Sequence, residues 1–555
     1  MPGRLSLLRF AAAPPLPVGA LDSGAIVAPV PRVLREGATH IIASMRIYAA
    51  QTKVPLRTAF FAALGLTLAF RFWLAQALPM TGDEAEFVMW GAYPDFGYFD
   101  HPPMIGWTLA LLLRLSEAQW VLRLPAIFLP ALVAFAMLQY LRRVDEDKAY
   151  LAALAFLLVP ANVWNVLITT DTPLVLFSFL SALCFAAALQ RESQSLYAAC
   201  GAFLGLAFLS KYLTVLLGLG YLAFVLSQAP GRRSWRGLAT VGVALLPFLA
   251  FNVWWNYNHC WANVLFNVYN RHESAGFSLR TPPLYVASVL YMLCPVALLQ
   301  FWRGRTGLRQ PLSEPRTRFF MLAWTVPLGV FAALSLVKQI GLHWLLSFVP
   351  LFFIAAALLL SAAQLRRSTI YLLAFSALHV AAIAGVSQLP IETWKGSRYY
   401  EGIVFHAKIA ELLQRLEPYA GKYEFAADGF SPAETASYAS RKYFFVFGTA
   451  SSHGRQDDIH TDFRTLAGKS ILILRKKPPP AAEYTPYFAR VRFRQFELYG
   501  ATYYLVLGEG FDYQRYREAV LRPLRDRYYR ISSFLPMGHC FFCERYFPDE
   551  PCPTR

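Results

Sequence analysis

The stretch YAACGAFLGLAFLSKYLTVLLGLGYLAFVLS, residues 197–227, decides how many times this chain can cross a membrane. This apolar run is longer than the roughly 20 residues that one membrane-spanning helix needs. Ser210 and Lys211 stand in its middle, and a lysine at the centre of a bilayer is energetically expensive. We therefore expect two short helices that turn near Lys211 and bring its ammonium group to the membrane surface.

The composition places the whole chain in the same class. Of the 555 residues, 56% are hydrophobic and only 15% are charged, and the mean hydropathy is +0.38. Soluble domains are nearer 25% charged. The sequence therefore predicts a mostly α-helical multi-pass membrane protein with about 11 transmembrane helices. The other apolar spans fall at about 58–79, 119–141, 149–168, 173–189, 237–253, 284–302, 319–337, 344–363 and 370–388.

The net charge of +18 reflects membrane topology, and we expect membrane lipids and no nucleic acid among the partners. Arginine-rich loops between apolar runs mark the cytoplasmic side. With eleven spans and an inside N-terminus, these loops share one side: residues 142–143, 191, 231–236, 303–318 and 366–367. The opposite side then collects residues 80–118, 169–172, Lys211, 254–274, 338–344 and everything after about 389.

The chain divides into three predicted parts. Residues 1–56 are rich in Ala, Pro and Val without a helical period, so we expect a disordered cytoplasmic leader, or a true start at Met45. Residues 57–388 form the transmembrane domain, with the outer loop at 80–118. Residues 389–555 predict an α/β domain outside the membrane, with strand-like 442–448 and 469–477 and helix-like 406–420.

An acidic loop, MTGDEAEFVMWGAYPDFGYFDHPPM (residues 80–104), follows the first span directly. Acidic residues stabilise helix N-termini, and this structural role is our prediction for Glu86 and Asp95. For Asp83 we favour a functional role, because the motif is too long and too specific for a cap. The spacing predicts a short helix, a turn and a second helix lying on the bilayer.

The motif DEAEF…W…GYFDHPPMIGW resembles the first outer loop of GT-C glycosyltransferases of the protein mannosyltransferase and aminoarabinose transferase superfamily, including glycosyltransferase family 39. Further segments resemble this family in the same order, over roughly residues 58–475. They are TTDTPL with Asp171, SKY with Lys211, WWNYNHCWANVLFNVYNR, and KQIGLHW with Lys338 and His343.

The resemblance implies transfer of a monosaccharide from a polyprenyl-phosphate carrier to an envelope acceptor: lipid A or lipopolysaccharide core, a polysaccharide or a protein. It implies a bacterial inner membrane location, with the active site and the C-terminal domain in the periplasm. It also implies the catalytic pair Asp83 and Glu84 and the position of Asp171.

The residue chemistry agrees with this implication. A partly desolvated carboxylate can take the proton of an acceptor hydroxyl, and Asp83 is our candidate, with Glu84 and Asp171 as further catalytic carboxylates. A leaving phosphate needs cations that absorb its charge. We expect these from donor-binding residues at separate outer loop ends: His101, Lys211, Lys338 and His343.

Each candidate also has a structural alternative. Lys211 and Lys338 could be anchors at the membrane surface, and His343 could be an interfacial anchor beside Trp344. Asp171 could cap the helix after it. For residues 271–273 we expect a solvated loop, with contact to the acceptor as the alternative.

The sequence also leaves open a bound divalent cation and a function other than catalysis. Glu84 or Asp171 could help to bind Mg²⁺ or Mn²⁺, but without a tight ligand cluster we expect no required cofactor. The rivals to an enzyme are an inactive, purely binding relative and a transporter or flippase of lipid-linked sugars. Such transporters tend to have broken helices in two related halves, and the sequence has no internal repeat.

The tail motif HCFFCERYFPDEPC contains Cys540, Cys543 and Cys552 beside His539. These residues could bind zinc, but outside the membrane a disulfide is the more common fate of cysteines. We predict a disulfide, and three cysteines leave one without a partner in the tail.

Overall fold

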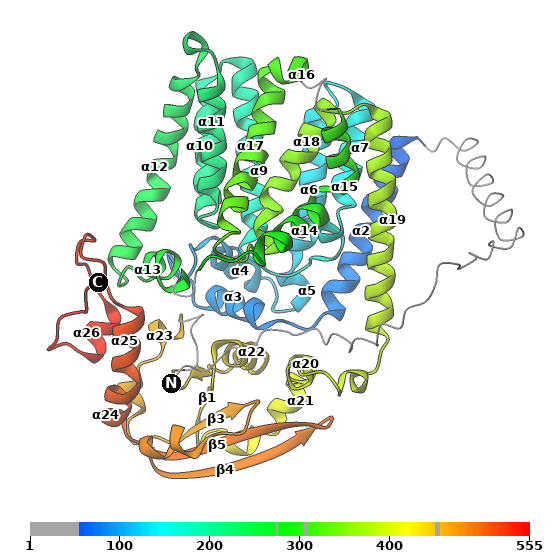
Figure 1. The fold of residues 1–555 in the computed structure, drawn as a ribbon. Coiled ribbons are helices and arrows are strands. Elements are labelled where there is room, and N and C mark those ends of the chain that lie inside the picture. The colour runs from blue at the N-terminus through cyan, green and yellow to red at the C-terminus, as the bar shows by residue number, and fades with distance from the viewer. Residues whose placement is uncertain (1–54, 273–275, 305–308, 450–455) are drawn as a thin grey trace, which may run out of the picture. The chain divides into compact units, whose positions relative to one another are not determined.

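A computed structural model describes residues 55–272, 276–304, 309–449 and 456–555. The predicted leader, including Met45, lies outside these residues apart from its last two positions. The ribbon in Figure 1 shows a set of long helices together with a small sheet formed late in the chain.

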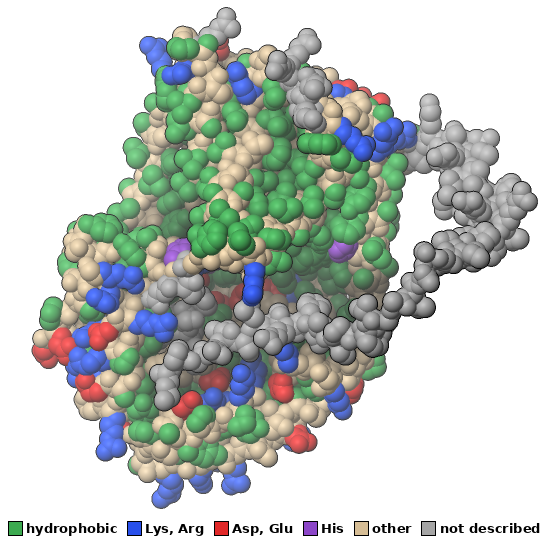
Figure 2. Space-filling view, in the orientation of Figure 1, with side chains coloured by type: hydrophobic (Ala, Val, Ile, Leu, Met, Phe, Trp, Pro, Cys, Tyr) green, Lys and Arg blue, Asp and Glu red, His purple; other side chains and the backbone are tan. Residues whose placement is uncertain are grey.

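Seven described helices are long and apolar enough to cross a membrane. An eighth crossing is possible if one helix pair, bent by 95°, counts as one span. Hydrophobic side chains cover these helices in Figure 2, and Lys and Arg gather at one end of them. The predicted class is therefore confirmed. The seven are α2 (Leu56–Ala77), α5 with α6 (Gln119–Leu122, Leu124–Leu141), α9 (Asp171–Arg191), α12 (Trp235–Tyr257), α17 (Pro315–Leu334), η4 with α18 (Leu342–Phe348, Val349–Leu359) and α19 (Ala362–Ser387).

The remaining predicted spans are shorter or bent helices. The bent pair is α14 (Thr281–Leu293) and α15 (Pro295–Arg303), and α7 (Glu146–Leu157) has only 12 residues before α8 (Pro160–Trp164). The total of eleven is reached only when the bent pair, α7, α10 and α11 are each counted as a span.

The long run at 197–227 forms the predicted helical hairpin, α10 (Gln194–Phe208) and α11 (Thr214–Ser227). Lys211 lies in the turn between them, but the expected surface exposure is wrong. The lysine is only 7% exposed, because it is paired inside the protein. Gly205 lets α10 approach α12 closely, since a Cβ there would lie 2.1 Å from Phe248.

The acidic outer loop forms the two predicted short helices, α3 (Gly82–Ala92) and α4 (Met104–Leu113). Thr81 caps α3, and Glu84 completes a capping box with it. The predicted capping roles of Glu86 and Asp95 are wrong. Glu86 is buried in α3, and Asp95 accepts bonds from its neighbour Phe96 and from Trp255 of α12.

The late part of the chain forms a five-stranded mixed sheet in the order β2-β1-β3-β5-β4. Its central strand β3 runs parallel to β1 and antiparallel to β5, and Ile473 pairs with Ala426 and Val506. The strands are β1 (Glu424–Ala427), β2 (Phe445–Val446), β3 (Ile471–Arg475), β4 (Phe488–Leu498) and β5 (Ala501–Phe511).

Two of these strands were predicted, and the β4–β5 hairpin was not. The helix-like run 406–420 contains α21 (Ile409–Gln414). Tyr499 and Gly500 join β4 to β5 with φ values of 53° and 78°. Two positive φ values suit a primed hairpin turn, and glycine tolerates this conformation best.

The sheet region contacts the acidic outer loop through helix α22 (Phe430–Ser440), which packs against α3. Gly82 is required at this contact, since a Cβ there would lie 1.9 Å from the Ser431 hydroxyl oxygen. The backbone N–H of Phe99 also donates to Gln456, next to α23 (Asp457–His460). The other described helices of this region are α20 (Tyr400–Ala407), α24 (Tyr513–Tyr516), α25 (Arg522–Tyr528) and α26 (Phe541–Tyr546).

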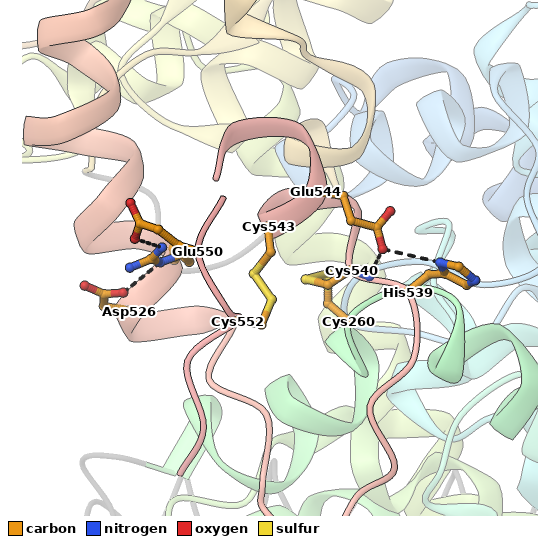
Figure 3. Close-up of a disulfide and its surroundings, with 9 residues drawn as sticks. Cys260, Asp526, His539, Cys540, Cys543, Glu544, Glu550 and Cys552 are labelled. Atoms are coloured by element: carbon orange, nitrogen blue, oxygen red, sulfur yellow. Dashed lines mark hydrogen bonds and ion pairs between the residues drawn. A yellow bond between two sulfur atoms is a disulfide. The ribbon is translucent and has the colours of Figure 1, made fainter. Parts of the chain in front are cut away.

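The tail cysteines form two disulfides, shown in Figure 3. Cys543 pairs with Cys552, and Cys540 pairs with Cys260, which is 280 residues away and lies just before α13 (Ala262–Val268). This agrees with the predicted disulfide and leaves these sulfurs no thiolate for zinc. The second bridge ties the end of the chain to the loop after α12.

Candidate functional site

Glu84 is a structural residue in this fold. Both of its oxygens accept bonds of 2.8 Å from Arg123, and it also accepts from the backbone N–H groups of Thr81 and Ile168. Glu84 is 1% exposed and Arg123 is fully buried. Because every oxygen is occupied, this geometry argues against the predicted catalytic or metal-binding role for Glu84.

Asp83, the next residue in the first turn of α3, has an exposed side chain. Consecutive helical residues point about 100° apart, which explains why Glu84 is buried while Asp83 is exposed. Asp83 is close enough to Asp100 and Glu86 for its charge to raise the pKa of both. The structure thus places Asp83 at the edge of an acidic cluster.

Lys211 and Asp171 form a buried ion pair. The ammonium nitrogen of Lys211 lies 2.9 Å from both carboxylate oxygens, and the residues are 7% and 3% exposed. Asp171 is the first residue of α9, and the position before it makes no side-chain cap. Pairing with Lys211, and not capping, is therefore what the structure assigns to Asp171, and neither residue is a surface anchor.

Lys338, Arg271 and Trp344 form a second group. The Arg271 guanidinium lies 5.2 Å from the Trp344 ring centre, and the Lys338 ammonium lies 6.0 Å from it, within the range of cation–π attraction. The ammonium of Lys338 is 3.4 Å from the carbonyl oxygen of Arg271. Arg271, which we expected in a solvated loop, is half-buried instead.

Electrostatic contacts join these groups. Burial raises the pKa of Asp100 to about 7, while the charges of Arg271 and Lys211 oppose this shift. Burial lowers the pKa of His101 well below its usual value, and Lys211, Arg271 and His343 lower it further. His101 is therefore a neutral imidazole near pH 7, able to donate a hydrogen bond but not to supply positive charge.

A second acidic group lies behind Asp83. Glu86 and Glu434, on α3 and α22, are each 4% exposed, and each has a buried oxygen without a hydrogen-bond partner. Burial first, and then neighbouring carboxylates, raise the pKa of both well above the usual value. Uncompensated carboxylates of this kind favour the protonated form.

The structure thus brings together Asp83, Asp171, His101, Lys211, Lys338 and His343, and it separates Glu84 from them. Sequence reasoning assigned Arg271 to a solvated loop, with acceptor contact as the lesser alternative, and it missed Arg123 as the partner of Glu84. Arg123 could have been noticed, because it is a lone cation inside an apolar run, as Lys211 is.

Metal binding finds little support in the arrangement of ligands. Glu84 and Asp171, the predicted candidates, have their oxygens occupied by Arg123 and Lys211. Within the described ranges, only the tail cysteines bring three potential ligand atoms close together, and those cysteines are in disulfides.

Comparison with known proteins gives both sequence and structural matches. Residues 100–256 match the family model described as dolichyl-phosphate-mannose-protein mannosyltransferase. The chain is 27% identical over 283 residues to the lipid A galacturonosyltransferase RgtD of Rhizobium johnstonii, covering 47% of this chain and 60% of RgtD.

Solved structures of ArnT from Cupriavidus metallidurans share the fold. The form bound to undecaprenyl phosphate matches with a TM-score of 0.57 at 14% identity, over 80% of this chain and 97% of ArnT. The apo form matches with a TM-score of 0.53 at 15% identity.

The chain therefore has the GT-C fold of membrane glycosyltransferases. The predicted resemblance to the protein mannosyltransferase and aminoarabinose transferase superfamily is confirmed. The family model includes Asp171 and Lys211 but begins after Asp83 and ends before Lys338.

Proposed function

We propose that this protein transfers a monosaccharide from a polyprenyl-phosphate carrier to a hydroxyl group of a cell-envelope acceptor. The observation that carries the proposal is that Lys211 and Arg271 both lie near Asp100 of the acidic loop that contains Asp83, with Lys338 beside Arg271. A phosphate leaving group needs such cations. ArnT in its structure holds undecaprenyl phosphate, which supports a carrier of this class.

In the proposed reaction, Asp83 accepts the proton of the acceptor hydroxyl as that oxygen forms a bond to C1 of the sugar. The bond from C1 to the phosphate oxygen breaks with its electron pair, and polyprenyl phosphate leaves with inversion at C1. Lys211, Lys338 and Arg271 stabilise the phosphate, and Asp171 fixes the ammonium of Lys211. Neutral His101 donates a hydrogen bond to a phosphate oxygen.

The acceptor and the location belong to the same proposal. RgtD acts on lipid A according to its name, so lipid A or lipopolysaccharide core is our first candidate acceptor, ahead of a polysaccharide or a protein. We propose the bacterial inner membrane, with the site on the periplasmic side. The sequence relatives are named as transferases, which favours this proposal over the transporter alternative.

Substituting Asp83 tests the proposal. Membranes containing the Asp83→Asn variant should lose transfer from a radiolabelled polyprenyl-phosphate sugar, by at least about 100-fold for loss of a general base. The matched control is Asp147→Asn, since Asp147 is also an exposed aspartate in a first helical turn. Normal transfer by the Asp83→Asn variant would remove Asp83 from the base role.

A chelation experiment tests the expectation that no metal is required. We propose that protein cations alone hold the phosphate, so treatment with EDTA should leave the transfer rate unchanged. Loss of activity that Mg²⁺ or Mn²⁺ restores would contradict this.

A further inference from the structure

A cavity of about 870 Å³ lies in the sheet region, away from the cluster around Lys211. It is bordered by the amino-terminal ends of the parallel strands β1, β2 and β3 and by the segment after α23. We call it the strand-end groove, and its volume lies within the roughly 300–1,000 Å³ of ligand pockets. We propose that the strand-end groove binds an acidic oligosaccharide, which is the distal part of the acceptor.

The lining combines partly exposed aromatic rings with polar groups. Tyr423, Phe425 and Tyr443 present rings to the groove, and Thr461 and Ser470 add polar side chains. Aromatic residues with a polar handle suit ligands that have both apolar and hydroxylated surfaces. A sugar chain has this character, since its C–H faces pack on rings while its hydroxyls form hydrogen bonds.

The charges select an acidic ligand. Glu424 is paired with Lys469 at 2.9 Å, and Asp462 is paired with Arg464 at 2.8 Å. Lys422 and Lys442 are both exposed, and no carboxylate of the described residues lies at ion-pair distance from either. The Lys442 ammonium lies 6.0 Å from the ring centre of Phe425, which also lines the groove. The groove therefore offers two ammonium groups to carboxylate or phosphate groups of a ligand.

Its position connects the groove to the transfer site. Tyr93 ends α3, and its ring lies 5.3 Å from His460 and 6.4 Å from Tyr443, both of which line the groove. Asp83 lies ten residues earlier in the same helix, or roughly 15 Å away at 1.5 Å per residue. An acceptor of several sugar units would span this distance, with its reacting hydroxyl at Asp83.

This inference rests on the proposed function for the identity of the ligand as acceptor, but its test measures binding alone. Purified full-length protein in detergent is titrated calorimetrically with four probes: tetramannuronate, neutral mannotetraose, phosphorylated mannotetraose and tetraglutamate. An acidic tetrasaccharide should bind at least about tenfold more tightly than mannotetraose, and salt should weaken it. The two acidic sugars show whether carboxylate or phosphate is preferred.

Variants locate the site. The double variant Lys422→Gln/Lys442→Gln should reduce binding of the acidic sugar to the level of mannotetraose. The control double variant Lys395→Gln/Lys477→Gln removes two exposed lysines outside the groove and should bind normally. Unfolding temperatures verify that each variant is folded.

The inference fails if the acidic and neutral sugars bind equally, if neither binds, if the peptide alone binds, or if the Lys422/Lys442 variant binds as the wild type does. Asp83→Asn should abolish transfer without changing binding in the groove. If the wild type binds acidic sugars but does not transfer, only the proposed function is refuted. If it transfers but does not prefer acidic sugars, only the proposed role of the strand-end groove is refuted.

Discussion

At the level of single residues, the Lys211–Asp171 pair joins the stability of the fold to the proposed binding of phosphate. Two charges buried at less than 10% exposure are tolerated only because each satisfies the other. In the proposed reaction, the phosphate would meet an ammonium that is already fixed in position, and this would reduce the entropy lost on binding.

Replacing only one residue of this pair should lower the stability of the fold more than replacing both. Lys211→Met leaves Asp171 buried without a partner, at a cost of roughly 3–5 kcal/mol. Adding Asp171→Asn to Lys211→Met should recover a large part of that loss while transfer stays low in both variants. Thermal unfolding in detergent measures the first effect, and equal unfolding temperatures for the single and double variants would contradict it.

Lys338 should give the donor-binding step a pH dependence. Burial, together with the Arg271 charge, lowers the pKa of Lys338 to about 8. The ammonium is therefore charged at pH 7 and mostly neutral at pH 9. We expect kcat/KM for the donor to fall about tenfold over this interval, since that ratio reports groups of the free enzyme.

The Lys338→Arg variant is the control for this profile, because a guanidinium stays charged throughout. Its kcat/KM should lack the fall near pH 8. A fall that survives in this variant would assign the titration to another group.

At the level of elements, the packing of α3 on α22 buries Glu86 and Glu434 together. Their pKa values in the folded protein are raised, so the folded state keeps protons that the unfolded chain releases above about pH 4.5. The stability associated with these groups is present at low pH and is lost as pH rises. The interface should therefore be weakest at neutral and alkaline pH.

Replacing both residues with glutamine should remove this dependence. We expect the Glu86→Gln/Glu434→Gln variant to unfold at a higher temperature than the wild type at pH 8, and the difference to shrink toward pH 4.5. Each unit of pKa elevation corresponds to about 1.4 kcal/mol. Glu497→Gln, on the exposed face of β4, is the control, and an unchanged pH slope in the double variant would refute the argument.

Local patterns predicted the elements better than they predicted their partners. The hairpin at Lys211 follows from run length and one lysine, but burial of that lysine depends on Asp171, 40 residues away. The bridge from Cys260 to Cys540 spans 280 residues, and no spacing rule connects such positions. The β4–β5 hairpin was missed although Tyr499-Gly500 is a recognisable turn.

For the candidate site as well, the sequence predicted positions better than it predicted contacts. Motif order predicted Asp83, Asp171, Lys211 and Lys338, because each lies at the end of a predicted span. The sequence could not show that adjacent Glu84 is bound by Arg123, since side-chain direction within α3 depends on tertiary packing. Arg271 was assigned to a solvated loop because it lies in a short segment without periodicity.

For the whole molecule, two independent chemical arguments support the proposed membrane orientation. Disulfides form and persist in oxidising compartments, so Cys260, Cys540, Cys543 and Cys552 favour a periplasmic position for the loop after α12 and the end of the chain. Arginine-rich loops mark the opposite, cytoplasmic side. Both arguments support the proposed periplasmic position of the sheet region and the cation cluster.

Two exposed glycines test this orientation as a matched pair. Gly396 precedes α20, and Gly231 lies between α11 and α12; a side chain at either would meet no atom within 4 Å. In spheroplasts, Gly396→Cys should react with a membrane-impermeant maleimide, while Gly231→Cys should react only after the membrane is permeabilised. If Gly231→Cys reacts from outside, Lys211, at the opposite end of α11, would face the cytoplasm. Lys211 and the proposed donor carrier would then lie in different compartments. Transfer by the mechanism above would then be impossible, because the base and the phosphate-binding cations must meet the substrate on the same side.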